Sequence, residues 1–259
     1  MKAAARIACI VVGMIASVLS METYAQNAAG RGGPAQIGRG AALVDLTGYW
    51  VSIVSEDWRF RMVTPAKGDF QGVPMTPEAA RVANTWDPNA DQQAGLACKS
   101  YGAPGIMRVP ERVHITWQDD TTLRLDTDAG TQTRLFQFGG APSATAKPSW
   151  QGDSTARWEL PSGRGRAGGP SDQRTGSLKV TTTHLRSGYL RKNGVPYSDQ
   201  ARLTEYFDVV QERNGTPWLV VTTVVEDPQY LTQPFITSTQ FKKQADASGW
   251  EPTPCSSVW

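Results

Sequence analysis

The strongest structural signal in this 259-residue chain is the stretch RLTEYFDVVQERNGTPWLVVTTVVE, residues 202–226. Its two alternating runs are Arg202–Gln211 and Trp218–Glu226, and between them lies Arg213-Asn214-Gly215-Thr216. An Asn-Gly pair between two runs rich in β-branched and aromatic residues is typical of a tight hairpin turn. The stretch therefore predicts two neighbouring antiparallel strands.

The same period-two alternation of apolar and polar side chains recurs along the chain, as expected of strands with one buried face. The runs that show it are 58–62, 113–117, 123–125, 156–160, 178–182 and 235–241. Closure of such a sheet on itself removes its unpaired edges. We therefore expect an all-β fold, an antiparallel up-and-down β-barrel of eight or more strands with one short helix and long loops.

The one expected helix follows Thr76. Threonine can cap a helix N-terminus, Pro77 suits the first helical position, and Glu78 complements the helix dipole. Because the helix falls between strands, we expect it at a barrel mouth or on the outside of the barrel.

Composition excludes several classes of protein. The chain is 39% apolar and 19% charged, which allows a sizeable core and excludes a disordered tail. Its formal net charge is +2, with no basic stripe, so we expect no nucleic-acid partner.

The N-terminus has the pattern of an export signal. Lys2 and Arg6 precede an apolar run, Ile7–Leu19, and Thr23-Tyr24-Ala25 has the small residues of a cleavage site. We predict a signal peptide over 1–25, a periplasmic or secreted protein, and no stable membrane insertion after cleavage. An uncleaved anchor is the alternative.

The remaining chain divides by its glycine content. Residues 26–41 are predicted to be a flexible lead-in, and 161–174 a mobile surface loop, because glycine-rich segments bury little surface. Residues 42–259 are then a single β-barrel domain. The sequence does not indicate an oligomeric state.

Loss of Cys9 with the signal leaves two cysteines, Cys98 and Cys255. In an oxidising compartment such a pair favours a disulfide, here one that would close a very long loop. Two free buried thiols are the alternative.

The start of the first strand, Gly48-Tyr49-Trp50, resembles the Gly-x-Trp signature of the lipocalin and calycin barrels. The resemblance implies a barrel in which Trp50 plugs the closed end and the open end admits a small apolar ligand. The chain lacks the Thr-Asp-x-Tyr motif of typical lipocalins. Residues 188–197 and 226–235 are similar to a group of exported bacterial β-barrel proteins of unassigned activity.

Histidine and the polar loop after residue 184 supply the candidates for chemistry. Imidazole in an apolar cup can act as a general base, and arginine or tyrosine can stabilise an anion. The candidate catalytic residues are His184, His114, Tyr189, Tyr197 and Arg186. The alternatives are structural histidines and a long rim loop with a turn at Lys192-Asn193-Gly194.

Aromatic side chains on the expected strands could line a cavity and favour a planar or aromatic ligand. The candidate ligand-binding residues are Trp58, Phe60, Trp218, Tyr206 and Phe235. No spacing typical of a metal site, and no phosphate or dinucleotide loop, is present, so we expect no metal and no cofactor.

Three functions remain open at this point. The first is a carrier that binds a small apolar or aromatic molecule in the barrel. The second is a cofactor-independent isomerase, lyase or hydratase with His184 as its general acid or base. The third is a structural envelope protein without a ligand.

Overall fold

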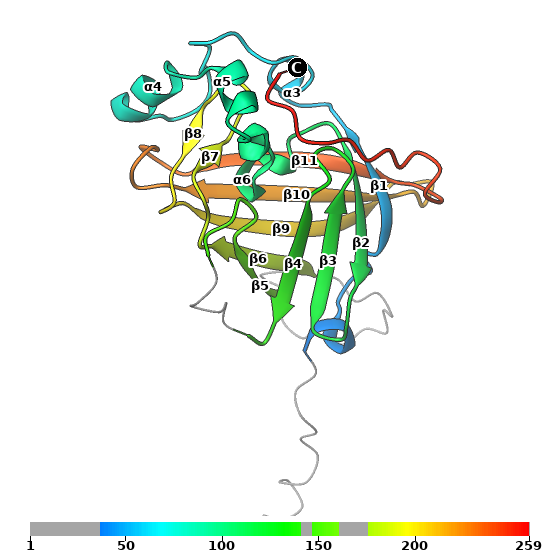
Figure 1. Ribbon diagram of the computed structural model, residues 1–259. Helices are drawn as coiled ribbons and strands as arrows, with labels where there is room; N and C mark the ends of the chain where they lie inside the picture. The colour runs from blue at the N-terminus through cyan, green and yellow to red at the C-terminus, as the bar shows by residue number, and fades with distance from the viewer. Residues whose placement is uncertain (1–36, 141–146, 161–175, 259) are drawn as a thin grey trace, which may run out of the picture. The chain divides into compact units, whose positions relative to one another are not determined.

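The computed structural model describes residues 37–140, 147–160 and 176–258. The predicted signal peptide, most of the predicted lead-in and the predicted 161–174 loop lie outside the described residues. Within the described residues, nine strands form one closed barrel in the order β1-β11-β10-β9-β6-β5-β4-β3-β2 (Figure 1). The all-β barrel expected from the alternation is confirmed.

The last three strands of the barrel are the longest. The bounds of all the barrel strands are β1 (Gly48–Ile53), β2 (Arg112–Trp117), β3 (Thr122–Thr127), β4 (Thr133–Phe138), β5 (Asp153–Glu159), β6 (Ser177–Thr183), β9 (Arg202–Gln211), β10 (Pro217–Glu226) and β11 (Phe235–Lys243). A separate two-stranded ribbon, β7 (Gly188–Tyr189) with β8 (Pro196–Tyr197), lies between β6 and β9 in sequence.

Strand pairing is antiparallel with one exception. β4 and β5 run parallel, with Phe136 opposite Ser154. The barrel closes at β1, where Trp50 lies opposite Val113 of β2 on one side and Lys243 of β11 on the other. The predicted hairpin is confirmed as β9–β10, and Gly215 adopts the positive φ of 82° that its tight turn needs.

Helices gather at one end of the barrel, which we call the mouth (Figure 1). The predicted helix is α4 (Pro77–Ala83), and the Thr76 hydroxyl accepts a 3.1 Å hydrogen bond from the Ala79 amide. The others are α3 (Trp58–Arg61), α5 (Pro88–Gln93), η2 (Ala97–Tyr101) and α6 (Ala103–Ile106).

The opposite end holds η1 (Gly38–Ala41), coloured blue in Figure 1. The Trp158 indole donates a 2.9 Å hydrogen bond to the Gly38 carbonyl, and the Arg39 amide donates one of 2.9 Å to the Asp120 carbonyl. These last residues of the predicted lead-in are therefore ordered against the barrel.

The strand expected over 58–62 is wrong, because these residues form α3 and the turn after it. Trp58 is 64% exposed, whereas Arg61 is 1% exposed. Trp58 and Arg61 have thus exchanged the exposure that a strand would give them, whereas Arg59 is exposed and Phe60 is half-buried. The Arg61 guanidinium explains the exchange, since it bonds to the barrel wall and so turns the helix that way.

The interior of the barrel is filled by side chains. Trp50 is buried there, and its indole donates a 2.9 Å hydrogen bond to the Leu46 carbonyl. Ile106 and Met107 of the α6 segment belong to the same buried cluster, so this segment plugs the mouth. The strands contribute Val113, Ile115, Leu123, Leu125, Phe136, Leu178, Val180, Phe207, Leu219, Val221 and Phe241.

A polar layer is buried within the strands as well. The Arg134 guanidinium makes two hydrogen bonds to the carboxylate of Glu205, one of them 2.9 Å, and both side chains are fully buried. Arg134 also donates to Thr182 at 3.3 Å, and the Thr182 hydroxyl lies 2.8 Å from that of Ser154. A forked, hydrogen-bonded pair is the form in which a buried charge is tolerated.

The expected disulfide joins Cys98 to Cys255 across a sequence separation of 157 residues. It fastens the C-terminal segment to η2 at the mouth. A second attachment lies nearby, where the Ser257 hydroxyl donates to the Pro88 carbonyl at 2.6 Å. Among the described residues, no helix combines the length and apolarity needed to cross a membrane.

Candidate ligand site at the mouth of the barrel

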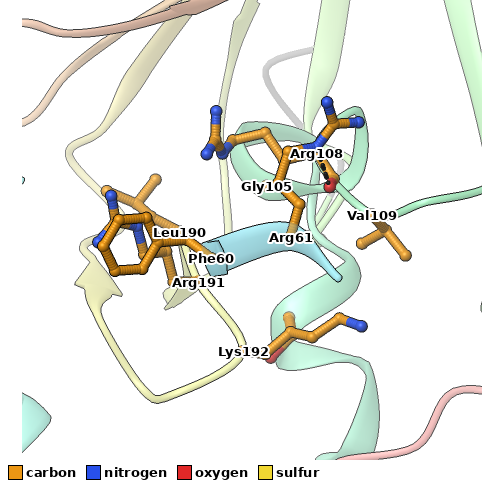
Figure 2. Close-up of a pocket in the computed structure, with 9 residues that line it drawn as sticks. Phe60, Arg61, Gly105, Arg108, Val109, Leu190, Arg191 and Lys192 are labelled. Atoms are coloured by element: carbon orange, nitrogen blue, oxygen red, sulfur yellow. Dashed lines mark hydrogen bonds between the residues drawn. The ribbon is translucent and has the colours of Figure 1, made fainter. Parts of the chain in front are cut away.

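A small pocket opens at the mouth, where α3, α6 and the turn after β7 meet (Figure 2). Its enclosed space is about 20 Å³, enough for about one water-sized group. The lining residues are Phe60, Arg61, Ser100, Gly105, Arg108, Val109, Leu190, Arg191 and Lys192. Four of them are cationic and none is acidic.

Arg61 is anchored on every side. Its Nε donates to the Arg108 carbonyl at 2.9 Å, and its Nη2 donates to the Ser52 hydroxyl at 2.9 Å. Its Nη1 forms an ion pair with Glu56. Burial lowers the pKa of Arg61, and the charge of Glu56 opposes that shift. Arg61 therefore holds α3 against β1 and the α6 segment, and shapes the pocket floor.

Arg108 and Arg191 are less completely paired. Arg108 Nη2 forms a 2.9 Å ion pair with Asp57, but its buried Nη1 has no hydrogen-bond partner among the described residues. Arg191 Nη1 donates to the Gln71 carbonyl at 2.7 Å, and its buried Nε likewise has no partner there. The Arg191 guanidinium lies 4.1 Å from the Phe60 ring centre, a stacking contact.

The turn that carries Arg191 and Lys192 is held rigidly. Asn193 Nδ2 donates to the carbonyls of Ala66 at 3.1 Å and Asp69 at 2.9 Å. Gly194 has φ +83°, and a Cβ there would lie 2.4 Å from the Trp86 side chain. Only glycine fits this position, so the sequence fixes the turn that presents the two cations.

Burial lowers the pKa of both Arg191 and Lys192. Desolvation, and then the charge of Arg108, lowers the pKa of Arg191 to about 10. Desolvation also lowers the pKa of Lys192 to about 8. These shifts show that the pocket concentrates positive charge in a poorly hydrated place.

Glu111 lies just before β2 and is buried. Neither of its carboxylate oxygens has a hydrogen-bond partner among the described residues. Burial raises its pKa well above the ordinary value, Asp128 adds to the rise, and Arg61 and Arg134 oppose it. Glu111 therefore interacts electrostatically with one arginine of the pocket, Arg61, and with one arginine of the polar layer, Arg134.

The two histidines lie away from the interior. His184 follows the end of β6 with φ 58°, and its Nδ1 lies 2.9 Å from an Asp153 carboxylate oxygen. His184 therefore does not lie in the apolar cup that a general base of this kind needs, because its partner Asp153 alternates with the inward Ser154. His114 stacks on Tyr49 at 3.9 Å, on the face of β2 opposite the buried Val113.

The other three candidate catalytic residues each have separate surroundings. The Tyr189 hydroxyl donates to Asp91 at 2.7 Å, and burial raises its pKa. Tyr197 is fully buried in the apolar cluster beside β7 and β8. The Arg186 guanidinium lies 4.4 Å from the Trp150 ring centre. The structure does not join these groups to His184 in one hydrogen-bonded constellation.

Of the expected ligand-binding residues, two lie at the pocket. Phe60 lines it, and Phe235 contacts two of its arginines, with ring-centre distances of 6.0 Å to Arg108 and 5.9 Å to Arg191. Trp58 points to solvent. Trp218 and Tyr206 alternate with the buried Leu219 and Phe207, so they lie on the outer face of the barrel; these positions do not support Trp58, Trp218 and Tyr206 as cavity residues.

Arg61, Arg108 and Glu111 were not found by sequence reasoning. Charged residues are rarely buried, so alternation assigns them to the solvent face by default. The available signal was weaker: the rim segment around Arg191 and Lys192 is unusually polar, and these two residues do line the pocket.

The fold and site define a closed, mostly antiparallel β-barrel with a plugged mouth and a cationic pocket beside the plug. Comparisons with protein-family models, with curated proteins and with solved structures find no match. Among the described residues, no group of three or more His, Cys, Asp or Glu side chains is placed to hold a metal ion.

Proposed function

We propose that this chain is an exported carrier that binds a small molecule at the mouth of its barrel. Export is supported by the N-terminal signal pattern and by the disulfide, since disulfides persist mainly in oxidising compartments. The ligand site differs from the one expected from a lipocalin-like barrel, because side chains and the α6 segment occupy the interior.

The observation that carries the proposal is that two arginines lining the same pocket each keep a buried nitrogen without a partner. Arg108 Nη1 and Arg191 Nε are both buried without a partner among the described residues. Such an atom costs about 1–3 kcal/mol of stability, so folded proteins rarely keep several together without use. A bound molecule supplies the missing partners.

Apolar side chains lie beside these polar atoms. Phe60 lines the pocket and is half-buried, and Leu190 and Val109 line it and are buried. A few polar anchors beside aromatic and aliphatic side chains is the usual composition of a small-molecule site. The proposed ligand therefore retains the aromatic or apolar character expected from the sequence.

Native mass spectrometry of the mature protein from its own host tests the proposal. We expect an added small mass that is released, chemically intact, on denaturation. Phe60→Ala should lose it, and Trp58→Ala, on the exposed face of the same helix, should retain it. Protein that is always empty, or that converts added compounds with measurable turnover, would contradict a carrier.

A further inference from the structure

The pocket has a marked charge imbalance. Its lining contains Arg61, Arg108, Arg191 and Lys192, and no carboxylate. Two acids outside the lining offset part of this charge, since Glu56 pairs with Arg61 and Asp57 pairs with Arg108. The Arg191 guanidinium instead donates to a backbone carbonyl, so its charge is not cancelled by a direct ion pair among the described residues.

The two incompletely paired arginines lie beside the same ring. Both guanidinium groups are about 6 Å from the centre of Phe235, at 6.0 Å for Arg108 and 5.9 Å for Arg191. Arg108 and Arg191 are only 7% and 6% exposed. The like charge of Arg108 adds to the effect of burial in lowering the pKa of Arg191, so the two buried cations repel each other.

We propose that the head group recognised here is an oxyanion: a carboxylate, phosphate or sulfate on the small molecule of the proposed function. The unpartnered Nη1 of Arg108 and Nε of Arg191 would donate to its oxygens, and Phe60 would contact the atoms behind it. Guanidinium donors fit planar and tetrahedral oxyanions better than any other side chain. This inference rests on the proposed function and specifies its ligand.

The size of the pocket agrees with entry of one oxygen of the head group and not with a whole ligand. An enclosed space of about 20 Å³ admits an oxygen-sized group beside the arginines. The remainder of the molecule would then lie outward beside Phe60, which is half-buried. Recognition would depend mainly on the anionic end.

The test compares matched probes on the mature wild-type protein by isothermal titration calorimetry. The probes are benzoate, phenyl phosphate and benzamide, which share an aromatic body and differ in charge. We expect one or both anions to bind at least about tenfold more tightly than neutral benzamide, because hydrogen bonds to charged groups are the stronger ones. Their ranking separates a carboxylate site from a phosphate site.

Variants place the binding at the two arginines. Arg108→Gln and Arg191→Gln should each weaken anion binding by about tenfold or more, and Arg108→Lys should restore only part of it. Arg81→Gln removes the same charge from the exposed face of α4 and should change nothing. The comparison of benzoate with benzamide uses the wild-type protein alone. It therefore tests whether the site recognises an oxyanion even if the variants fail to fold.

Two results would overturn the oxyanion site. One is benzamide binding as tightly as the anions, and the other is unchanged anion binding in both folded glutamine variants. Either leaves the carrier function in place, provided that the native protein still contains an intact small molecule. An empty native protein that binds none of the three probes overturns both proposals.

Discussion

Inside the barrel, Arg134 is matched by a forked bond to the fully buried Glu205, whereas at the mouth Arg108 pairs with the exposed Asp57 and Arg191 has no carboxylate partner among the described residues. Both regions bury guanidinium groups almost completely. The strands therefore hold a charge that is already neutralised, and the mouth holds charge that is not. This difference teaches that burial of a charge does not by itself mark a site, and neither does one unpartnered nitrogen, since Arg134 Nε has no partner in the described part of the chain either; the missing or exposed carboxylate partner does.

The largest effect should come from breaking the matched pair. Glu205→Gln leaves the Arg134 charge buried and unpaired, so the free energy of unfolding should fall by about 3–5 kcal/mol in urea denaturation. Replacing both residues by methionine should cost less than Glu205→Gln alone. The exposed pair of Arg81 and Glu78 supplies the control, and a Glu78→Gln loss as large as that of Glu205→Gln would contradict the comparison.

The second effect concerns the attachment of the mouth. Replacing Cys98 and Cys255 together by serine should lower the free energy of unfolding by about 2–4 kcal/mol, because the bond restricts a long loop in the unfolded chain. Ligand affinity should fall as well, since η2 carries Ser100 of the pocket lining. Reductant should weaken the wild type and leave the double variant unchanged; equal responses would argue against the bond.

A third prediction uses the buried carboxyl between the two regions. Because burial raises the folded-state pKa of Glu111, the folded protein binds more protons than the unfolded chain above about pH 4.5. Wild-type stability should therefore fall relative to Glu111→Gln as the pH rises, by at most about 1.4 kcal/mol per unit. Thermal denaturation of both proteins from pH 4 to 8 measures this, and a difference independent of pH would contradict it.

The smallest effect should be the pH dependence of binding at Lys192. Its pKa of about 8 means that the free site loses this charge above pH 8, whereas a bound anion favours the protonated form. Benzoate affinity should therefore fall above pH 8, by at most about tenfold per unit. Lys192→Met should bind more weakly at pH 7 and show no such fall; an identical pH profile in the variant would exclude this role.

The barrel could be predicted from sequence because strand alternation is local. The Asn-Gly turn fixed the register of β9 against β10, and the Thr76 cap fixed the start of α4. β4 (Thr133–Phe138) was not predicted, although Arg134, Phe136 and Phe138 all face inward. The inward Arg134 breaks the apolar pattern of the strand. Its burial is explained only by Glu205 of β9, which is distant in sequence.

The site was predicted only where its signal is local. Arg191 lies in an unusually polar segment after His184, and Phe60 is an aromatic residue in an alternating run. Arg61 and Arg108 depend on contacts with Ser52, Glu56 and Asp57 that a four-residue helix creates. Periodicity cannot report so short a helix, because five residues are too few to separate a period of 3.6 residues from a period of two.

The pairing of β1 with β11 has a consequence for biosynthesis. The first strand finds one of its two neighbours only in residues 235–243, close to the end of the chain. A nascent or truncated polypeptide that stops before this point keeps two open sheet edges, which invite association with other chains. Closure of the barrel therefore has to wait until residues 235–243 are available to pair with β1.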